Sequence, residues 1–293
     1  MRFVRKEIKI CTRTRHVCWH LVIALAMVFG CTLVLVAQTP VLAPNDLVRL
    51  SVENELKAAN ESTSFMFRAR KETLHGSQTK LYVQTREATV AMLIAINDQL
   101  LTPKQRQAEE ARLDNLSGNP DELRHKQKQE KEDADRISRI VHAMPNAFIY
   151  EYDGTHTGKS GVGRSGDKLV RLEFRSNANY SPPSRTEQVV AGMQGYVLID
   201  ANKYRMAEIS GTLYKDVRFG WGILGHLDKG GHLHVELGKN GDSPWTITRM
   251  SLNFAGRILL FKSLVIRSDE VYSNFQSVPA NLTLAQGVEL LKK

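Results

Sequence analysis

The pattern of apolar and polar positions divides the chain into a mixed N-terminal part and a long C-terminal series of strands. A capping residue at 44–46 precedes apolar positions at helical spacing, which predicts a helix over about 45–60. Alternation with a period of two follows, broken by a turn at 75–77, and predicts a three-stranded meander over about 65–96. Its third segment, 90–96, is nearly continuous in apolar residues, so a helix is an alternative there.

A charged stretch interrupts this alternation between Pro103 and His142. It contains nine Lys or Arg and nine Asp or Glu, with few large apolar residues. Two polar helices fit it, and the break at 117–120 lets Asn119 cap the second helix with Pro120 at its first position. The stretch is either a partner-binding arm or movable lid, or a solvated, ion-paired helical hairpin, and balanced charge favours the hairpin.

Beyond Met144 and Pro145 the chain alternates nearly to its end, with Gly, Asn and Asp between the segments. We expect eight strands, at 147–152, 168–175, 195–200, 204–214, 217–224, 232–237, 245–254 and 257–267. This series favours one large curved antiparallel sheet or partial barrel over a doubly wound parallel fold. The predicted fold class is therefore α+β: an open half-barrel with helices covering its concave side.

Composition adds little to this fold prediction but narrows the range of partner molecules to expect. The 293 residues are 42% hydrophobic and 24% charged, which is ordinary for a globular chain. Of the formal net charge of +9, residues 1–20 contribute +5. The remaining excess is spread over more than 250 residues, so we expect no nucleic-acid partner.

The N-terminal 37 residues have the pattern of an export signal. Six basic residues precede Leu21–Ala37, which carries no charge. Cleavage after Ala37 would leave one domain at 38–293, and an uncleaved membrane anchor is the alternative. Both place the domain outside the cytoplasm, in the periplasm or cell envelope.

The three cysteines, Cys11, Cys18 and Cys31, all lie in this N-terminal stretch. The residues before Cys31 resemble a bacterial lipidation box, although a core position of the leader fits Cys31 better. The domain at 38–293 contains no cysteine, which excludes disulfides and a cysteine nucleophile there.

Two short motifs suggest chemistry. Residues 161–166 read G-x-G-x-x-G, but a strand is expected after them where a dinucleotide site needs a helix, so we expect a hairpin loop and no cofactor. His232, His234 and Glu236 alternate on one strand, with His226 nearby, and could bind zinc in a metal-dependent hydrolase. Alternation alone also explains them as a solvent-facing row. The compact signatures of hydrolases are absent, and we expect no enzyme.

Aromatic residues are frequent on the expected C-terminal strands. They could form an ordinary sheet core, but a thin helical cover over a concave sheet can also leave room for an apolar ligand. The candidates for lining such a cavity are Phe174, Phe219, Trp221, Trp245, Phe254 and Phe261.

Three segments carry a resemblance to a known family: 192–200 (GMQGYVLID), 204–209 (YRMAEI) and 245–249 (WTITR). They resemble the LolA-like carriers, which sort bacterial outer-membrane lipoproteins. The resemblance covers about residues 45–275 and implies an open curved sheet that holds acyl chains in the periplasm. The charged stretch is larger than that family leads one to expect.

These observations predict a non-enzymatic periplasmic carrier that holds a lipid or lipidated partner in an apolar cavity. The alternative is an envelope interaction or sensor protein that docks a partner protein through the helices at about 103–143.

Overall fold

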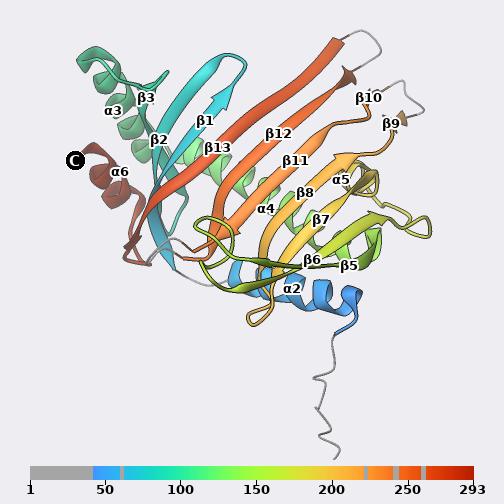
Figure 1. Cartoon of the computed structure of the whole chain (residues 1–293). Helices are drawn as coiled ribbons and strands as arrows, with labels where there is room; N and C mark the ends of the chain where they lie inside the picture. Colours follow the sequence, from blue (N-terminus) through green and yellow to red (C-terminus); the bar gives the residue numbers. More distant parts are fainter. Residues whose placement is uncertain (1–41, 60–62, 221–223, 240–243, 259–261) are drawn as a thin grey trace, which may run out of the picture. The chain divides into compact units, whose positions relative to one another are not determined.

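The computed structural model describes residues 42–59, 63–220, 224–239, 244–258 and 262–293. The described strands form one sheet in which every pair is antiparallel (Figure 1). The strand order is β4-β3-β2-β1-β13-β12-β11-β8-β7-β6-β5, and β9 and β10 form a short extension beside β12. The strands are β1 (Ser64–Thr73), β2 (Gly76–Gln84), β3 (Thr89–Ile96), β4 (Gln99–Leu100), β5 (Phe148–Thr157), β6 (Lys168–Ser176), β7 (Met193–Asp200), β8 (Met206–Leu213), β9 (Val217–Phe219), β10 (Gly225–Leu227), β11 (His232–Gly238), β12 (Thr246–Ile258) and β13 (Lys262–Val278).

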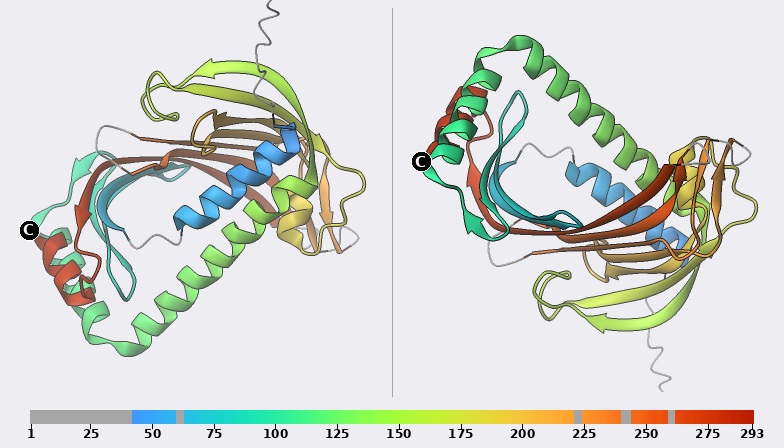
Figure 2. Two further views of the ribbon diagram at one scale, coloured as in Figure 1. Left: turned by 90° about the horizontal axis from the view of Figure 1, so that it is seen from below. Right: turned by 90° about the horizontal axis from the view of Figure 1, so that it is seen from above.

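Helices cover both faces of this sheet, but at different places. They are α2 (Pro44–Ala59), α3 (Pro103–Gly118), α4 (Pro120–Ala147), α5 (Arg185–Val190) and α6 (Leu284–Lys292). Helices α2 and α4 lie on the concave side of the sheet, and α3 and α6 lie outside the curl formed by β1 to β3 (Figure 2).

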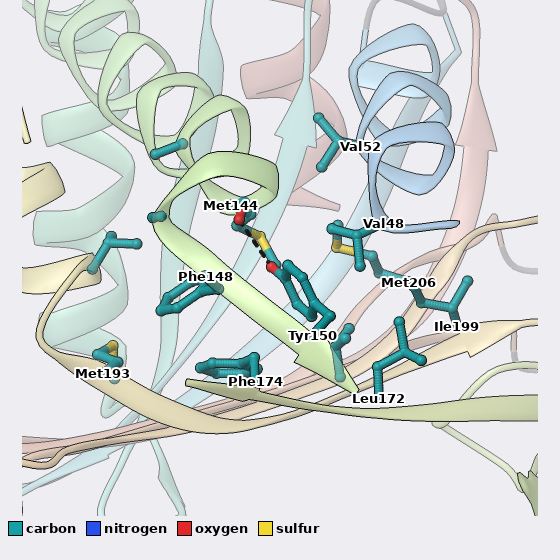
Figure 3. Close-up of a cluster of buried hydrophobic side chains, with 14 of the residues drawn as sticks. Val48, Val52, Met144, Phe148, Tyr150, Leu172, Phe174, Met193, Ile199 and Met206 are labelled. Atoms are coloured by element: carbon teal, nitrogen blue, oxygen red, sulfur yellow. Dashed lines mark hydrogen bonds between the residues drawn. The ribbon is translucent and has the colours of Figure 1, made fainter. Parts of the chain in front are cut away.

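The main hydrophobic core lies on the concave side, where α2 and the last turns of α4 meet β5 to β8 (Figure 3). Phe148 and Phe174 lie at its centre, with ring centroids 4.5 Å apart. The Tyr150 hydroxyl donates to the Met144 carbonyl at 3.0 Å, which satisfies a buried phenol and links β5 to α4. Burial of these large side chains fixes the end of α4 on the sheet.

A second core lies on the opposite face, between β2, β3, α3 and α6. Val83, Val90 and Met92 point from the strands towards Leu113 of α3 and Val288 of α6. Helix α4 therefore begins beside one core and ends in the other, because Leu123 packs against the second core and Met144 lies in the main core.

The α+β half-barrel predicted from the sequence is confirmed. The segment 90–96 forms a strand, the helix expected at 45–60 forms α2, and Asn119 caps α4 by accepting from the Asp121 and Glu122 N–H groups. The G-x-G-x-x-G segment is a loop that is followed by strand β6, in agreement with the hairpin interpretation.

Several elements differ from the sequence prediction. The strand expected at 217–224 ends at Phe219, and in place of the strand expected at 257–267 the chain has the end of β12 and then β13, which runs to Val278. Helix α4 continues through Met144 and Pro145 to Ala147. Helix α6 lies in a segment for which the sequence pattern predicts no helix or strand. The break expected at 255–256 is wrong, because β12 runs on to Ile258. Gly256 does not turn the chain there: it faces the backbone of β10, where an added Cβ would lie 2.1 Å from the His226 carbonyl oxygen.

Helices α3 and α4 are ion-paired and mostly exposed, as expected of polar helices, but they do not stand apart as a hairpin. Helix α3 packs on α6 and β3, whereas α4 packs on α2 and α5. Among the described residues, no helix is both long enough and apolar enough to cross a membrane. The expected export signal at 1–37 and Cys31 lie outside the described residues.

Candidate functional site on the concave face

Three of the six aromatic residues expected to line a cavity belong to the main core. Phe174 and Phe254 are buried, and the partly exposed Phe219 packs against the same cluster. They pack in a cluster that also includes residues of α2, α4 and α5, so these side chains contribute to folding stability.

Trp245 lies elsewhere. Its Nε1 donates to the Met206 carbonyl at 2.9 Å, and its ring packs with Leu169 and Leu198 in a small cluster that also includes Val162 of the glycine-rich loop. Trp221 and Phe261 lie outside the described residues. Of the four described candidates, three thus share the main core and Trp245 does not.

A different group of aromatic side chains gathers on β1, β2 and β13. The Phe67 ring stacks on Tyr82 at a centroid distance of 5.1 Å and on Phe275 at 5.2 Å, and Tyr272 lies 6.3 Å from Phe67. We call these four residues the aromatic patch. The strand register brings them together, because Phe67 pairs directly with Tyr82 and Ala69 with Tyr272.

The register also shows which face carries the patch. Glu270 is two residues from Tyr272 and therefore on the same face, and it pairs with Met250 of β12. Leu252 and Phe254 alternate with Met250 and pack against the main core. The aromatic patch is therefore on the concave face, continuous with the wall that α2 and α4 cover farther along (Figure 2).

No side chain of the patch is fully buried. Helix α2 packs chiefly on α4, β5 and β8. On α4, Ile137 is spaced three and seven residues from the packed Ile140 and Met144, so it lies on the inward face, yet its side chain is 60% exposed. Apolar side chains on the sheet and on the helix thus remain accessible to solvent on the concave side.

One charged group borders the patch. Glu270 accepts from the Tyr272 hydroxyl at 2.7 Å and forms an ion pair with Lys71, also at 2.7 Å. Burial, followed by the hydrogen bond to Glu270, raises the pKa of Tyr272. Burial, followed by the charge of Glu270, also raises the pKa of Tyr82. Both phenols are therefore neutral at physiological pH and present flat rings with a polar edge.

The candidate metal ligands are not arranged around a common point. His226 contacts Asp228 at 3.1 Å, His232 contacts the Thr212 hydroxyl at 3.0 Å, and His234 lies 3.4 Å from Glu236. On β11, His232 and His234 point away from the main core, as alternation predicts, because Leu233 of the same strand packs inward. Within the described residues, no group of three or more His, Cys, Asp or Glu side chains could hold a metal ion.

The sequence pattern places Phe67 and Tyr82 within the predicted meander at 65–96 but gives neither a role. It predicts no strand at 268–278, which contains Tyr272 and Phe275. The alternation of β13 beyond Arg267 is weak because Asn274 adopts a left-handed conformation at φ 56° and shifts the alternation by one residue.

Comparison with known proteins assigns no family to the chain. No family model matches it, and a search of curated proteins finds no match. The resemblance of 192–200, 204–209 and 245–249 to LolA-like carriers stays a prediction.

Proposed function

We propose that this protein is a non-enzymatic carrier of the cell envelope that holds an acyl chain of a lipid or lipidated protein against the concave face of its sheet. The aromatic patch on β1, β2 and β13 is the main contact surface, and α4 lies across the bound chain.

The observation that carries this proposal is the incomplete burial of apolar side chains on the concave side. Phe67, Tyr82 and Ile137 would gain by further burial, yet neither the sheet nor α4 covers them. Burial of apolar surface stabilises a complex by roughly 25 cal/mol for each Å², so a hydrocarbon chain laid along the stacked rings binds without any specific polar contact.

The fold supports the same function. An open, curved antiparallel sheet with a helical cover provides a long apolar wall of the kind that suits a flexible, linear ligand. The resemblance to LolA-like carriers, together with the expected export signal, favours the lipid or lipoprotein traffic of a bacterial envelope. The function requires no covalent step, and the proposal therefore assigns no catalytic residue.

The direct test is organic extraction and mass spectrometry of the full chain expressed in a bacterium and purified without added lipid. We expect a phospholipid or another acyl-bearing molecule at a stoichiometry approaching one. Tyr272→Ser should reduce the retained lipid several-fold, because it removes a flat apolar surface from the patch.

Val271→Ser is the matched control, because Val271 neighbours Tyr272 on β13 but lies on the convex face with its side chain 40% exposed. It should retain as much lipid as the unmodified chain. Extraction that yields no lipid, even after incubation with labelled phospholipid, would refute the proposal, as would equal losses in the two folded variants.

A further inference from the structure

A polar groove crosses the surface where α5 leads into β7 and where β8 leads into β9. Its volume is about 940 Å³, and a smaller hollow of about 340 Å³ beside α4 shares the side chain of Tyr180 with it. We call the two together the Tyr180 groove. The groove lies at the end of β8, which pairs through β11 and β12 with the first half of β13. Phe275 lies near the other end of β13, so the groove and the aromatic patch are at opposite ends of the sheet.

Cationic side chains outnumber carboxylates on the walls of this groove. The four cationic side chains are Arg139, Arg175, Lys215 and Arg218. The two carboxylates are Glu187 and Asp216. The two carboxylates already have donors. Asp216 accepts from the Lys229 N–H at 2.9 Å, and Glu187 is buried and accepts from the Ser184 hydroxyl.

The cations, in contrast, are largely unneutralised. Within the described residues, Arg139, Lys215 and Arg218 form no ion pair with a carboxylate, and Arg175 reaches Glu151 only at 3.3 Å with both side chains well exposed. Exposed pairs of this kind contribute little, so Arg175 is free to exchange its partner. Positive charge in a concave polar surface concentrates anions there.

Neighbouring contacts hold the groove in shape. Gln188 donates to the Arg218 carbonyl at 2.9 Å, which fixes α5 against β9. The Lys215 ammonium lies 5.0 Å from the centre of the Tyr214 ring. Hydrogen bonds first to Lys215 and then to Ser176 lower the pKa of Tyr214. The backbone of Arg218 is therefore anchored, and the Lys215 ammonium is held beside the Tyr214 phenol, a neutral partner that leaves its positive charge uncompensated.

We propose that the Tyr180 groove binds a phosphate-bearing anion, with Arg175, Lys215 and Arg218 as its principal donors. Guanidinium groups donate two parallel hydrogen bonds to phosphate oxygens, and an ammonium adds a compact charge. The anion is either a free phosphate ester or the phosphodiester of a lipid headgroup, which share this chemistry. The groove is separate from the aromatic patch, so this proposal does not depend on the carrier function.

The test measures binding of inorganic phosphate and of vesicles to the full chain, by calorimetry and by co-sedimentation. The vesicles are phosphatidylcholine alone or with phosphatidylglycerol. Lys215→Glu/Arg218→Glu should weaken phosphate binding at least about tenfold, since hydrogen bonds to charged groups are each worth about that factor. Loss confined to phosphatidylglycerol vesicles, with no binding of free phosphate, would identify a lipid headgroup as the source.

Arg164→Glu/Lys168→Glu is the matched control, because it makes the same change in net charge at exposed positions outside the groove. It should bind both probes as the unmodified chain does, and circular dichroism should show all variants folded. Absence of binding to both probes would overturn the proposal. Equal weakening in the two double variants would also overturn it, because the effect would then depend on net charge alone.

Discussion

At the scale of single residues, one carboxylate fixes the position of α2 on the sheet. Glu55 accepts from Arg205 Nε at 2.8 Å and from Arg205 Nη2 at 2.9 Å, and it also accepts from the Met206 N–H at 2.8 Å. The two side chains are only 15% and 20% exposed. A hydrogen-bonded ion pair that is this little exposed contributes strongly to stability, because removing one partner leaves the other charge poorly solvated.

We expect Glu55→Ala to lower the free energy of unfolding by about 2–3 kcal/mol, since it removes three charge-assisted hydrogen bonds and leaves Arg205 without its carboxylate partner. Glu53→Ala, at an exposed position of the same helix, should change it by less than about 0.5 kcal/mol. Urea denaturation of both variants measures the difference. Equal stabilities would show that α2 is held by its apolar side chains alone.

Residue patterns predict which positions face the sheet interior, but not what covers them. Phe67 and Phe254 both lie in segments that the pattern predicts to be strands, and both are on the concave face. Phe254 is buried in the main core, whereas Phe67 is only partly covered. That difference depends on long-range packing, which the local sequence around either phenylalanine does not encode.

At the scale of elements, the charged helices protect the edge of the sheet. Beyond its short pairing with β4, strand β3 has unpaired backbone groups along its outer side. Side chains of the helices supply the partners: Glu130 of α4 accepts from the Thr89 N–H at 3.1 Å, and Glu109 of α3 accepts from the Leu93 N–H at 3.2 Å. Arg112 donates to the Ala91 carbonyl at 2.7 Å. Such contacts block pairing with another chain.

The stability contribution of Glu109 should depend on pH. Burial alone raises the pKa of Glu109, but hydrogen bonds from Arg112 and the Leu93 N–H outweigh this effect and bring the pKa below its ordinary value. The contribution is therefore present above the unfolded pKa of about 4.3 and is lost as the pH falls through the lower folded value.

Glu109→Gln should accordingly be less stable than the unmodified chain at pH 7, with the difference shrinking below about pH 4. Urea denaturation between pH 3 and pH 7 measures it. Glu132→Gln, on the exposed part of α4, should follow the profile of the unmodified chain. A Glu109→Gln deficit that stays constant with pH would show that the lost contact is not ionic.

The boundaries of these elements were predictable where a residue has a strong local preference. Asn119 and Pro120 mark the start of α4 correctly, since both act through the first turn alone. The end of α4 was not predicted correctly, because the helix continues through Pro145 to Ala147. The missing N–H of a proline removes only one helical hydrogen bond, and burial of Met144 and Ala147 in the main core holds the last turn.

At the scale of the whole described chain, the ionisation of the tyrosines depends on the fold. The pKa values of six of the eight tyrosines are raised, in each case chiefly by burial: Tyr82, Tyr150, Tyr152, Tyr180, Tyr196 and Tyr272. Their stabilising contribution is complete below the unfolded pKa of about 10 and is lost as the pH rises towards the folded values.

An absorbance titration of phenolate should therefore show most tyrosines ionising late and together with unfolding. An earlier single step should come from Tyr214, whose pKa is lowered, and should disappear in Tyr214→Phe. Circular dichroism recorded in parallel separates ionisation from unfolding. Ionisation of all eight phenols near pH 10 with the fold intact would contradict the described burial.

The class of the fold followed from the sequence because alternation over many segments has one common solution, a large antiparallel sheet. The division into two cores did not follow. The apolar spacing at 284–291 is compatible with a helix on either face, and only the curl of β1 to β3 places α6 opposite to α2. Long-range curvature of this kind has no signature in any one segment.

The course of α4 also has a topological consequence. Helix α4 is about 42 Å long at the usual rise per residue, and it is joined to the sheet at both ends, so sheet and helix together form a closed ring. Under the proposed carrier function, a ligand held between α4 and the sheet would enter by threading, unless one end of α4 detached. A single hydrocarbon chain would thread end-on, whereas a folded domain would require that detachment. A crosslink that fastens both ends of α4 should then exclude a bulky ligand and admit a slender one.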